Sequence, residues 1–254
     1  CDMNLTKPQK LIYDMEKFSS GSIAVICTSF FVKGKQNEEN LQAASNELFR
    51  INDALRMRII ENSTGITQYV QDFHEQDFEV LHFEDMTAFI NYADAYAKDP
   101  IELSGQLCEI KIVILPDRYG LLVKIHHIIS DAWTVALLAT QFNLILKGEK
   151  VTAYSYLDYC DSEKNYLESK RYLRDKEFFL GQLKQCEEPA FISEKKERTF
   201  DAARKVIIIN TQQAKKIRDF AEKNEVSILS IWATVLAVYM GRLKTNSEKF
   251  FIGT

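Results

Sequence analysis

Two adjacent histidines and an aspartate four residues beyond them are the side chains in this sequence best suited to chemistry. His126, His127 and Asp131 all lie in the segment KIHHIISDAWT. A neutral imidazole accepts a proton near pH 7, so either histidine is a candidate general base. The aspartate stands just before a predicted helix, where a carboxylate caps free backbone amides. The pattern therefore allows either proton transfer or ordinary strand-end and helix-cap roles.

Strand periodicity separates the two histidines. Residues 121–127 are predicted to form a strand, and successive side chains in a strand point to opposite faces. His127 then shares a purely apolar face with Ile125, whereas His126 shares the other face with Lys124. We expect His127 to be the protected ring at the end of the strand. The alternative, a core histidine with both ring nitrogens hydrogen-bonded, stays open on pattern alone.

Other catalytic and metal-binding patterns are missing from the sequence. Adjacent histidines on opposite faces make a poor metal site, and His74 and His82 do not supply helical i, i+4 spacing. The five cysteines are widely separated, without a CxxC pair, and are read as reduced thiols. A GxSxG nucleophile motif is also absent. The sequence therefore predicts a site without a metal.

The elements that must position the motif alternate between strands and helices. Strands are predicted at residues 22–32 and in hairpins over 54–70 and 106–127, the second with a turn at 116–120 that includes Gly120. Apolar spacing predicts helices at 38–51, 86–97 and 131–146, and one or two more within 154–186. In this last segment an apolar stripe recurs every seven residues and is expected to pack against the sheet: Tyr159, Tyr166, Leu173 and Leu180.

A composition shift divides the chain. Residues 1–186 are expected to form an N-terminal lobe that carries the motif, and residues 187–203, with a proline and mixed charges, a surface linker. Residues 204–254 read as the beginning of a second lobe: a strand at 205–210, helices at 211–224 and 227–242, and a strand at 250–253. The missing initial methionine and the abrupt end FFIGT suggest an excised piece.

Charge and hydropathy exclude several partner classes. Net charge is −4, with 46% hydrophobic and 27% charged residues, and no strongly basic face is indicated for nucleic acid or an anionic membrane. No apolar run reaches the roughly 18 residues that a transmembrane helix needs. The opening CDMNLTKPQK lacks the apolar core of a signal peptide. We expect a cytoplasmic protein.

KIHHIISDAWT resembles the HHxxxDG motif of condensation domains of nonribosomal peptide synthetases, which belong to the chloramphenicol acetyltransferase-like superfamily. The match places Ala132 where the family has glycine. Four further stretches resemble family segments in the expected order: LTKPQKLIYDME, with Tyr13 at a tryptophan position, NDALRMRI, with Leu55 and Arg56 retained, YSYLDY and EKFFIGT. The likeness covers the whole chain and ends about halfway through a complete domain.

The resemblance implies a fold and roles for the residues. It implies an α/β (α+β two-layer sandwich) lobe of chloramphenicol acetyltransferase type, with a central mixed sheet packed by helices. His127 would be catalytic, as a base or as the group that positions the amine, and His126 would support it. Asp131 would be structural, paired with Arg56, because Ile51 replaces another arginine of the family. Ala132 is harmless if it is the first residue of the helix.

The resemblance also implies the reaction and its partners. An acyl or peptidyl thioester donor would be attacked by the amine of an aminoacyl thioester, both delivered on phosphopantetheine arms of carrier-protein domains. No cofactor would be bound directly, and an adenylation domain would be a neighbour in the same synthetase. Since the substrate tunnel needs both lobes, this piece alone is expected to be inactive.

Four alternatives remain. A freestanding acyl-CoA acyltransferase of the same superfamily fits the length, but its histidine motif lies near the C-terminus, whereas 127 residues follow His127 here. Cyclisation and epimerisation domains of the same family differ in the motif or in its flanking segments. A non-catalytic recruitment module would usually have lost the histidine motif.

Overall fold

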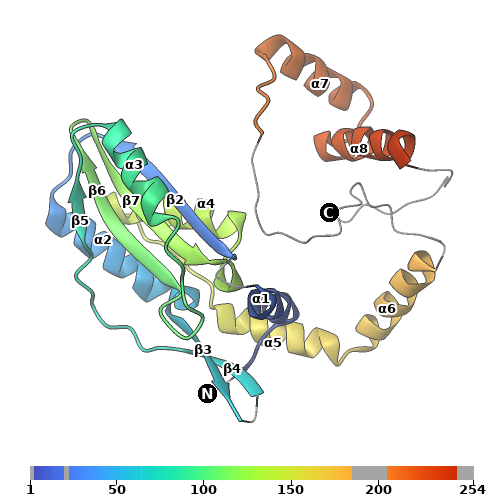
Figure 1. Ribbon diagram of the computed structural model, residues 1–254, viewed down its shortest axis with the longest axis horizontal. Helices are drawn as coiled ribbons and strands as arrows, with labels where there is room; N and C mark the ends of the chain where they lie inside the picture. The colour runs from blue at the N-terminus through green and yellow to red at the C-terminus, as the bar shows by residue number, and fades with distance from the viewer. Residues whose placement is uncertain (1–2, 20–22, 64, 185–204, 245–254) are drawn as a thin grey trace. The chain divides into compact units, whose positions relative to one another are not determined.

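The computed structural model describes residues 3–19, 23–63, 65–184 and 205–244 (Figure 1). The chain divides into two compact units, residues 1–167 and 168–254, and each is described by itself. The expected linker at 187–203 and the expected strand at 250–253 lie outside the described residues. The predicted lobe boundaries therefore stay predictions.

A four-stranded mixed sheet forms the centre of the first unit. Its order is β2 (Val25–Lys33), β7 (Arg118–His126), β6 (Cys108–Leu115) and β5 (Val80–His82). β7 runs antiparallel to both of its neighbours, β2 and β6, and β5 runs parallel to β6. The mixed sheet predicted from the sequence is confirmed, and its longest strands are the predicted 22–32 segment and the 106–127 hairpin.

The turn of the β6–β7 hairpin is tighter than predicted. β7 begins at Arg118, so only Pro116 and Asp117 separate the two strands. Gly120, predicted as a turn residue, lies inside β7. A Cβ there would sit 2.0 Å from the carbonyl oxygen of Phe30. Glycine is needed at this position because the neighbouring backbone approaches closely, not because the chain turns.

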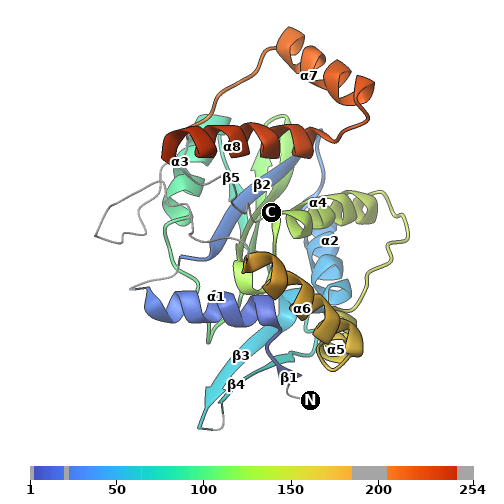
Figure 2. The ribbon, with the colours of Figure 1, turned by 90° about the vertical axis from the view of Figure 1, so that its right-hand side faces the viewer.

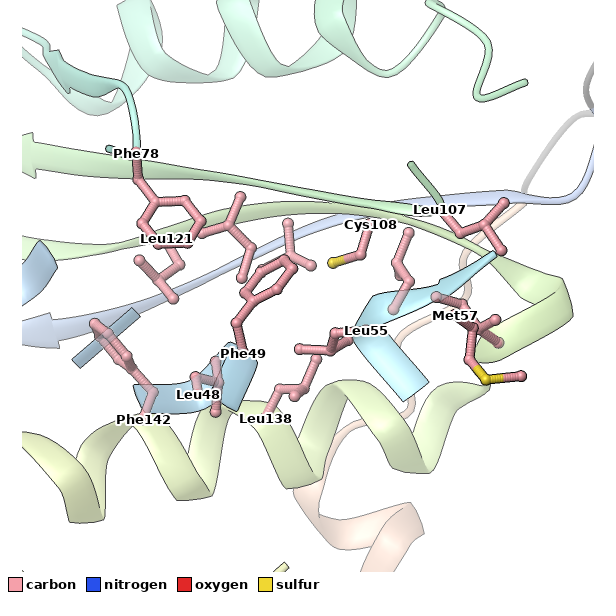
Figure 3. Close-up of a cluster of buried hydrophobic side chains, with 14 of the residues drawn as sticks. Leu48, Phe49, Leu55, Met57, Phe78, Leu107, Cys108, Leu121, Leu138 and Phe142 are labelled. Carbon is pink, nitrogen blue, oxygen red and sulfur yellow. The ribbon is translucent and has the colours of Figure 1, made fainter. Parts of the chain in front are cut away.

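Helices cover both faces of this sheet. α2 (Glu38–Ile51) and α4 (Ala132–Leu146) lie against one face, and α3 (Met86–Tyr96) lies against the other (Figures 1 and 2). All three helices agree with the predicted ranges. The larger core lies on the α2 and α4 side, where leucine and phenylalanine side chains from the helices meet the inward residues of the strands (Figure 3).

The first unit also contains a second, smaller sheet, two 3-10 helices and two further α-helices in its described part. The order β1 (Met3–Asn4), β4 (Gly65–Val70) and β3 (Met57–Asn62) is antiparallel, which confirms the predicted 54–70 hairpin. The 3-10 helix η1 (Asp53–Arg56) precedes it. α1 (Lys7–Phe18) contacts the 3-10 helix η2 (His127–Ile129) that follows β7. α5 (Tyr156–Leu167) completes the unit.

The second unit contains helices in its described part. They are α6 (Lys170–Leu183), α7 (Thr211–Lys223) and α8 (Ile228–Lys244), close to the predicted ranges. The predicted strand at 205–210 is wrong, since these residues join no ladder in the described structure. Isolated apolar runs form strands only where a partner strand is present.

The seven-residue stripe in α5 and α6 is not a core stripe. The stripe consists of Tyr159, Tyr166, Leu173 and Leu180, which are between 38% and 60% exposed. The predicted packing against the sheet is wrong for Tyr159 and Tyr166, which belong to the same unit as the sheet. One physical reason is that α5 ends at Leu167 and a new helix begins at Lys170, which breaks the repeat between two units.

No single helix in the described ranges is long and apolar enough to cross a membrane. By length and composition alone, α7 and α8 meet that criterion as a pair. The pair comprises Thr211–Lys223 and Ile228–Arg242, with a bend of 103° at the break between the two helices.

Candidate active site

His126 is the buried member of the histidine pair. It is the last residue of β7 and is fully buried. Its Nδ1 accepts a hydrogen bond from the backbone amide of Ile128 at 3.0 Å, which places the ring proton on Nε2. Burial lowers the pKa of His126, and the carboxylate of Glu16 partly opposes this effect. His126 is therefore neutral at pH 7 and unsuited to meet a substrate directly.

His127 is exposed, and the expected protected face is wrong for this residue. β7 ends at His126 and the chain turns into η2, so strand alternation no longer applies one residue later. Ile125 does point into the core as predicted. The backbone amide of His127 donates to the carbonyl of Ala24 at 2.6 Å. The result is an accessible imidazole on a fixed backbone.

Asp131 caps helix α4. Its carboxylate accepts hydrogen bonds from the backbone amide and the hydroxyl of Thr134, at 2.8 and 2.9 Å, and the hydroxyl accepts from the Asp131 amide at 3.1 Å. This is a reciprocal capping box. The backbone bond from Thr134 holds the pKa of Asp131 below its usual value. Ala132 is the first residue of α4, as predicted, and its helical backbone does not require a glycine.

Arg56 does not pair with Asp131. Its guanidinium donates to the backbone carbonyls of Phe49, Arg50 and Gln71, at 3.0, 3.2 and 2.9 Å. Of the ion pairs within the described ranges, none joins Arg56 to Asp131. The predicted pair is wrong because the free carbonyls at the C-terminal end of α2 provide acceptors close to this arginine.

Glu16, on α1, is the residue near the histidines that sequence reasoning missed. Its Oε1 lies 3.5 Å from Nε2 of His126, an atom without a hydrogen-bond partner among the described residues. The same oxygen accepts from the backbone amides of Ile23 and Ala24 at 2.9 and 2.7 Å. The side chain is 8% exposed. One carboxylate on an amphipathic helix, 110 positions before His126, gives no signal in the sequence alone.

Lys124, two residues before His126, is a second buried polar group. It is 2% exposed, and its Nζ lies 3.1 Å from Oε2 of Glu109 and 3.8 Å from the ring centre of Tyr96. The hydroxyl of Tyr96 donates to the same carboxylate oxygen. Strand alternation placed Lys124 on the face of His126, but its partners come from β6 and α3 and were not visible in the pattern.

The donor set of the described residues does not suit a metal ion. No group of three or more histidine, cysteine, aspartate or glutamate side chains converges within these ranges. Cys27, Cys108 and Cys160 are free thiols, and burial raises the pKa of each. Both histidines of the motif are held by backbone contacts instead. The candidate chemistry is proton transfer or amine positioning at His127.

Comparison with curated proteins finds large peptide synthases. Surfactin synthase subunit 1 of Bacillus subtilis (strain 168) is 23% identical over 226 residues, which are 82% of this chain and 6% of that protein. Bacitracin synthase 1 of Bacillus licheniformis is 27% identical over 228 residues, 82% of this chain and 4% of that protein. The chain thus spans a small part of the relatives that it matches.

Solved structures show the same fold. The condensation domain from the monacolin K polyketide synthase MokA has a TM-score of 0.78 at 14% identity, over 96% of this chain and 60% of that one. The starter condensation domain of the rhizomide synthetase RzmA has a TM-score of 0.65 at 20% identity, over 75% of this chain and 50% of that one. The predicted chloramphenicol acetyltransferase-like fold is confirmed. The profile described as the condensation domain matches residues 2–254, and this chain therefore belongs to the condensation-domain family.

Proposed function

We propose that this chain carries the histidine motif of a domain that forms an amide bond between two carrier-bound thioesters. The donor is an acyl or peptidyl thioester, and the acceptor is an aminoacyl thioester. The observation that carries the proposal is His127, an exposed imidazole on a fixed backbone at the end of β7, in a chain of the condensation-domain family.

In the proposed reaction the acceptor nitrogen attacks the donor carbonyl carbon. The C–N bond forms, the C–S bond breaks, and the donor's phosphopantetheine sulfur leaves as a thiolate. His127 accepts the proton that the attacking nitrogen loses, or holds that nitrogen in line, and the proton passes on to the departing sulfur. General-base help of this kind is typically worth about 10² to 10⁴ in rate, and alignment of two tethered substrates adds to it.

His126 has a supporting role in this proposal. As a buried neutral ring that binds the Ile128 amide, it fixes the peptide unit after His127 without meeting the substrate. Asp131 has a structural role as the cap of α4, and Arg56 closes the end of α2.

The proposed partners follow from the family. Carrier-protein domains upstream and downstream would deliver the phosphopantetheine arms, and an adenylation domain would load the acceptor in the same cytoplasmic synthetase. The matched proteins are named as a synthase subunit and a synthase, surfactin synthase subunit 1 and bacitracin synthase 1, which supports a place in a larger synthetase. Because the chain spans half to 60% of the solved domains it matches, we propose that it is inactive alone.

A second candidate differs in the donor. One solved relative is a starter condensation domain in complex with C8-CoA, which makes an acyl-CoA donor the competing hypothesis for this chain. The chemistry at the acceptor nitrogen would be unchanged, and only the group that leaves would differ.

The test uses the complete domain that contains this chain, with donor and acceptor carrier proteins loaded separately. Product transfer is followed by mass spectrometry of the phosphopantetheine arm. His127→Ala is expected to lower the rate by at least about 100-fold while the fold is retained. His74→Ala, an exposed histidine outside the motif, is the matched control and should transfer normally.

Three outcomes would contradict the assignment. Near-normal transfer by His127→Ala would remove this residue from the chemistry. Transfer from acyl-CoA, but not from a loaded donor carrier, would replace the carrier-bound donor by the second candidate. Carrier binding without any transfer by the folded wild type would favour a recruitment module.

A further inference from the structure

Glu16 occupies an unfavourable place for a carboxylate. It lies near the C-terminal end of α1, where the helix dipole disfavours negative charge, and only 8% of its side chain is exposed. Two backbone amides, those of Ile23 and Ala24, compensate for the lost water by donating to its Oε1. Because burial of this carboxylate costs free energy, we asked which part of the fold its hydrogen bonds hold in place.

The segment held by Glu16 is the segment that holds His127. The backbone amide of Ala24 donates to the Glu16 carboxylate, and the carbonyl of Ala24 accepts a hydrogen bond from the amide of His127 at 2.6 Å. This interaction continues past the last β2–β7 pair, Val25 with His126. The peptide unit before His127 is therefore fixed through Ala24 to a side chain on α1.

The other side of His127 is fixed by its neighbour. Nδ1 of His126 accepts from the amide of Ile128 at 3.0 Å, and the carbonyl of His126 accepts from the hydroxyl of Ser130 at 2.9 Å. The remaining ring nitrogen of His126, Nε2, lies 3.5 Å from Oε1 of Glu16, without a hydrogen bond between them. Both anchors of the His127 backbone thus converge on one carboxylate.

We propose that Glu16 is a positioning residue for His127, acting through Ala24 on one side and the ring of His126 on the other. The effect of Glu16 on the transfer rate rests on the proposed function. The effect of Glu16 on the His127 backbone does not. A displacement of about 1 Å at a reacting group costs about 100-fold in rate, so a fixed backbone matters here even though the His127 ring is exposed.

The first experiment uses this chain and needs no activity. Amide hydrogen exchange of His127 is measured in Glu16→Ala, Glu16→Gln and the control Asp14→Ala, which removes an exposed α1 carboxylate paired with Lys10. We expect Glu16→Ala to speed exchange at His127 by at least about tenfold. Glu16→Gln keeps an oxygen acceptor and should preserve protection, as should the control. Unchanged protection in a folded Glu16→Ala variant would overturn the proposal.

A second readout covers the case in which Glu16→Ala does not fold. The groups that act on the ring of His126 are Glu16 from α1 and His127 from η2. The carboxylate favours the protonated ring, so its loss in Glu16→Gln should lower the pKa of His126 further, as measured by NMR titration of the imidazole. A wild-type titration of His126 in Glu16→Gln would show that the two side chains do not interact, and would overturn the proposal.

The third readout is transfer in the complete domain. Glu16→Ala should lower kcat by about tenfold or more with little change in the KM for the acceptor carrier, and Glu16→Gln should restore most of the rate. Wild-type kcat in Glu16→Ala would overturn the positioning role. If the wild type transfers nothing, the proposed function fails, whereas the exchange and titration results still decide whether Glu16 holds the His127 backbone.

Discussion

The two faces of the central sheet differ sharply, although the same strands build both. Toward α2 and α4, β7 presents Leu121, Val123 and Ile125, which lie in one continuous apolar core (Figure 3). Toward the opposite side it presents Leu122, which packs with α3, and then Lys124 and His126. On β7, the first face presents apolar side chains only, and the second also buries an ammonium group and an imidazole.

This difference separates stability from positioning. On the apolar face any well-packed side chain of the right volume serves, because the hydrophobic effect is not directional. On the polar face each buried group needs a particular partner at a particular distance. Lys124 has Glu109 and Tyr96, and His126 has Ile128 and Glu16. Lys124 and His126 lead along β7 to the histidine motif. Loss of a partner of either residue is therefore expected to displace the candidate catalytic residue, His127.

The largest expected effect in stability is on the apolar face. Phe142 of α4 is fully buried and packs edge-to-face with Phe30 at 5.7 Å between ring centres. Phe142→Ala should lower the free energy of unfolding by about 3 to 5 kcal/mol, through lost burial and a residual cavity. Urea denaturation followed by circular dichroism measures the change. The control is Phe178→Ala at a position 60% exposed, which should change stability by less than about 0.5 kcal/mol.

The polar face should respond asymmetrically to two substitutions. Glu109→Gln leaves the buried ammonium of Lys124 without its carboxylate and should destabilise by about 1 to 3 kcal/mol, a range that allows for Glu109 being 40% exposed. Lys124→Met keeps the volume and removes the buried charge, so it should be nearly neutral or stabilising. The same denaturation assay compares them. A larger loss for Lys124→Met than for Glu109→Gln would mean that the ion pair is a net source of stability.

The elements of the fold were predictable because periodicity reports them directly. The apolar spacing of 38–51 predicted α2, and Leu41, Ala44 and Leu48 on this helix are buried. Alternation in β7 also assigned the faces of Ile125 and Lys124 correctly. Where a strand ends is much harder to predict, and a shift of one residue reverses the face. That single residue moved His127 from the expected apolar face to an exposed turn.

Contacts between distant elements were not predictable. Arg56 donates to backbone carbonyls instead of pairing with Asp131. A pattern of side chains does not show such main-chain acceptors, so this contact could not be predicted. Gly120 reads as a turn residue, and only the neighbouring strand reveals that it makes room for a backbone carbonyl. Glu16 joins α1 to the motif through main-chain amides. Each of these depends on which segments meet in space.

The smallest expected effect on stability is that of Asp131. This residue forms no ion pair with Arg56, so its structural role is that of a helix cap. Asp131→Ala should lower the free energy of unfolding by about 1 kcal/mol at pH 7, and Asp131→Asn, which still caps the helix, by much less.

The effect of Asp131 on stability should also depend on pH. Backbone hydrogen bonding depresses the pKa of Asp131 in the folded state. Its stabilising effect is therefore present above the unfolded pKa and is lost as pH falls through the folded pKa. The difference between wild type and Asp131→Ala should thus shrink toward pH 2, measured by urea denaturation at both pH values. A stable Asp131→Ala variant that no longer transfers would place this carboxylate in the chemistry, and the motif would then act through Asp131 as well as through His127.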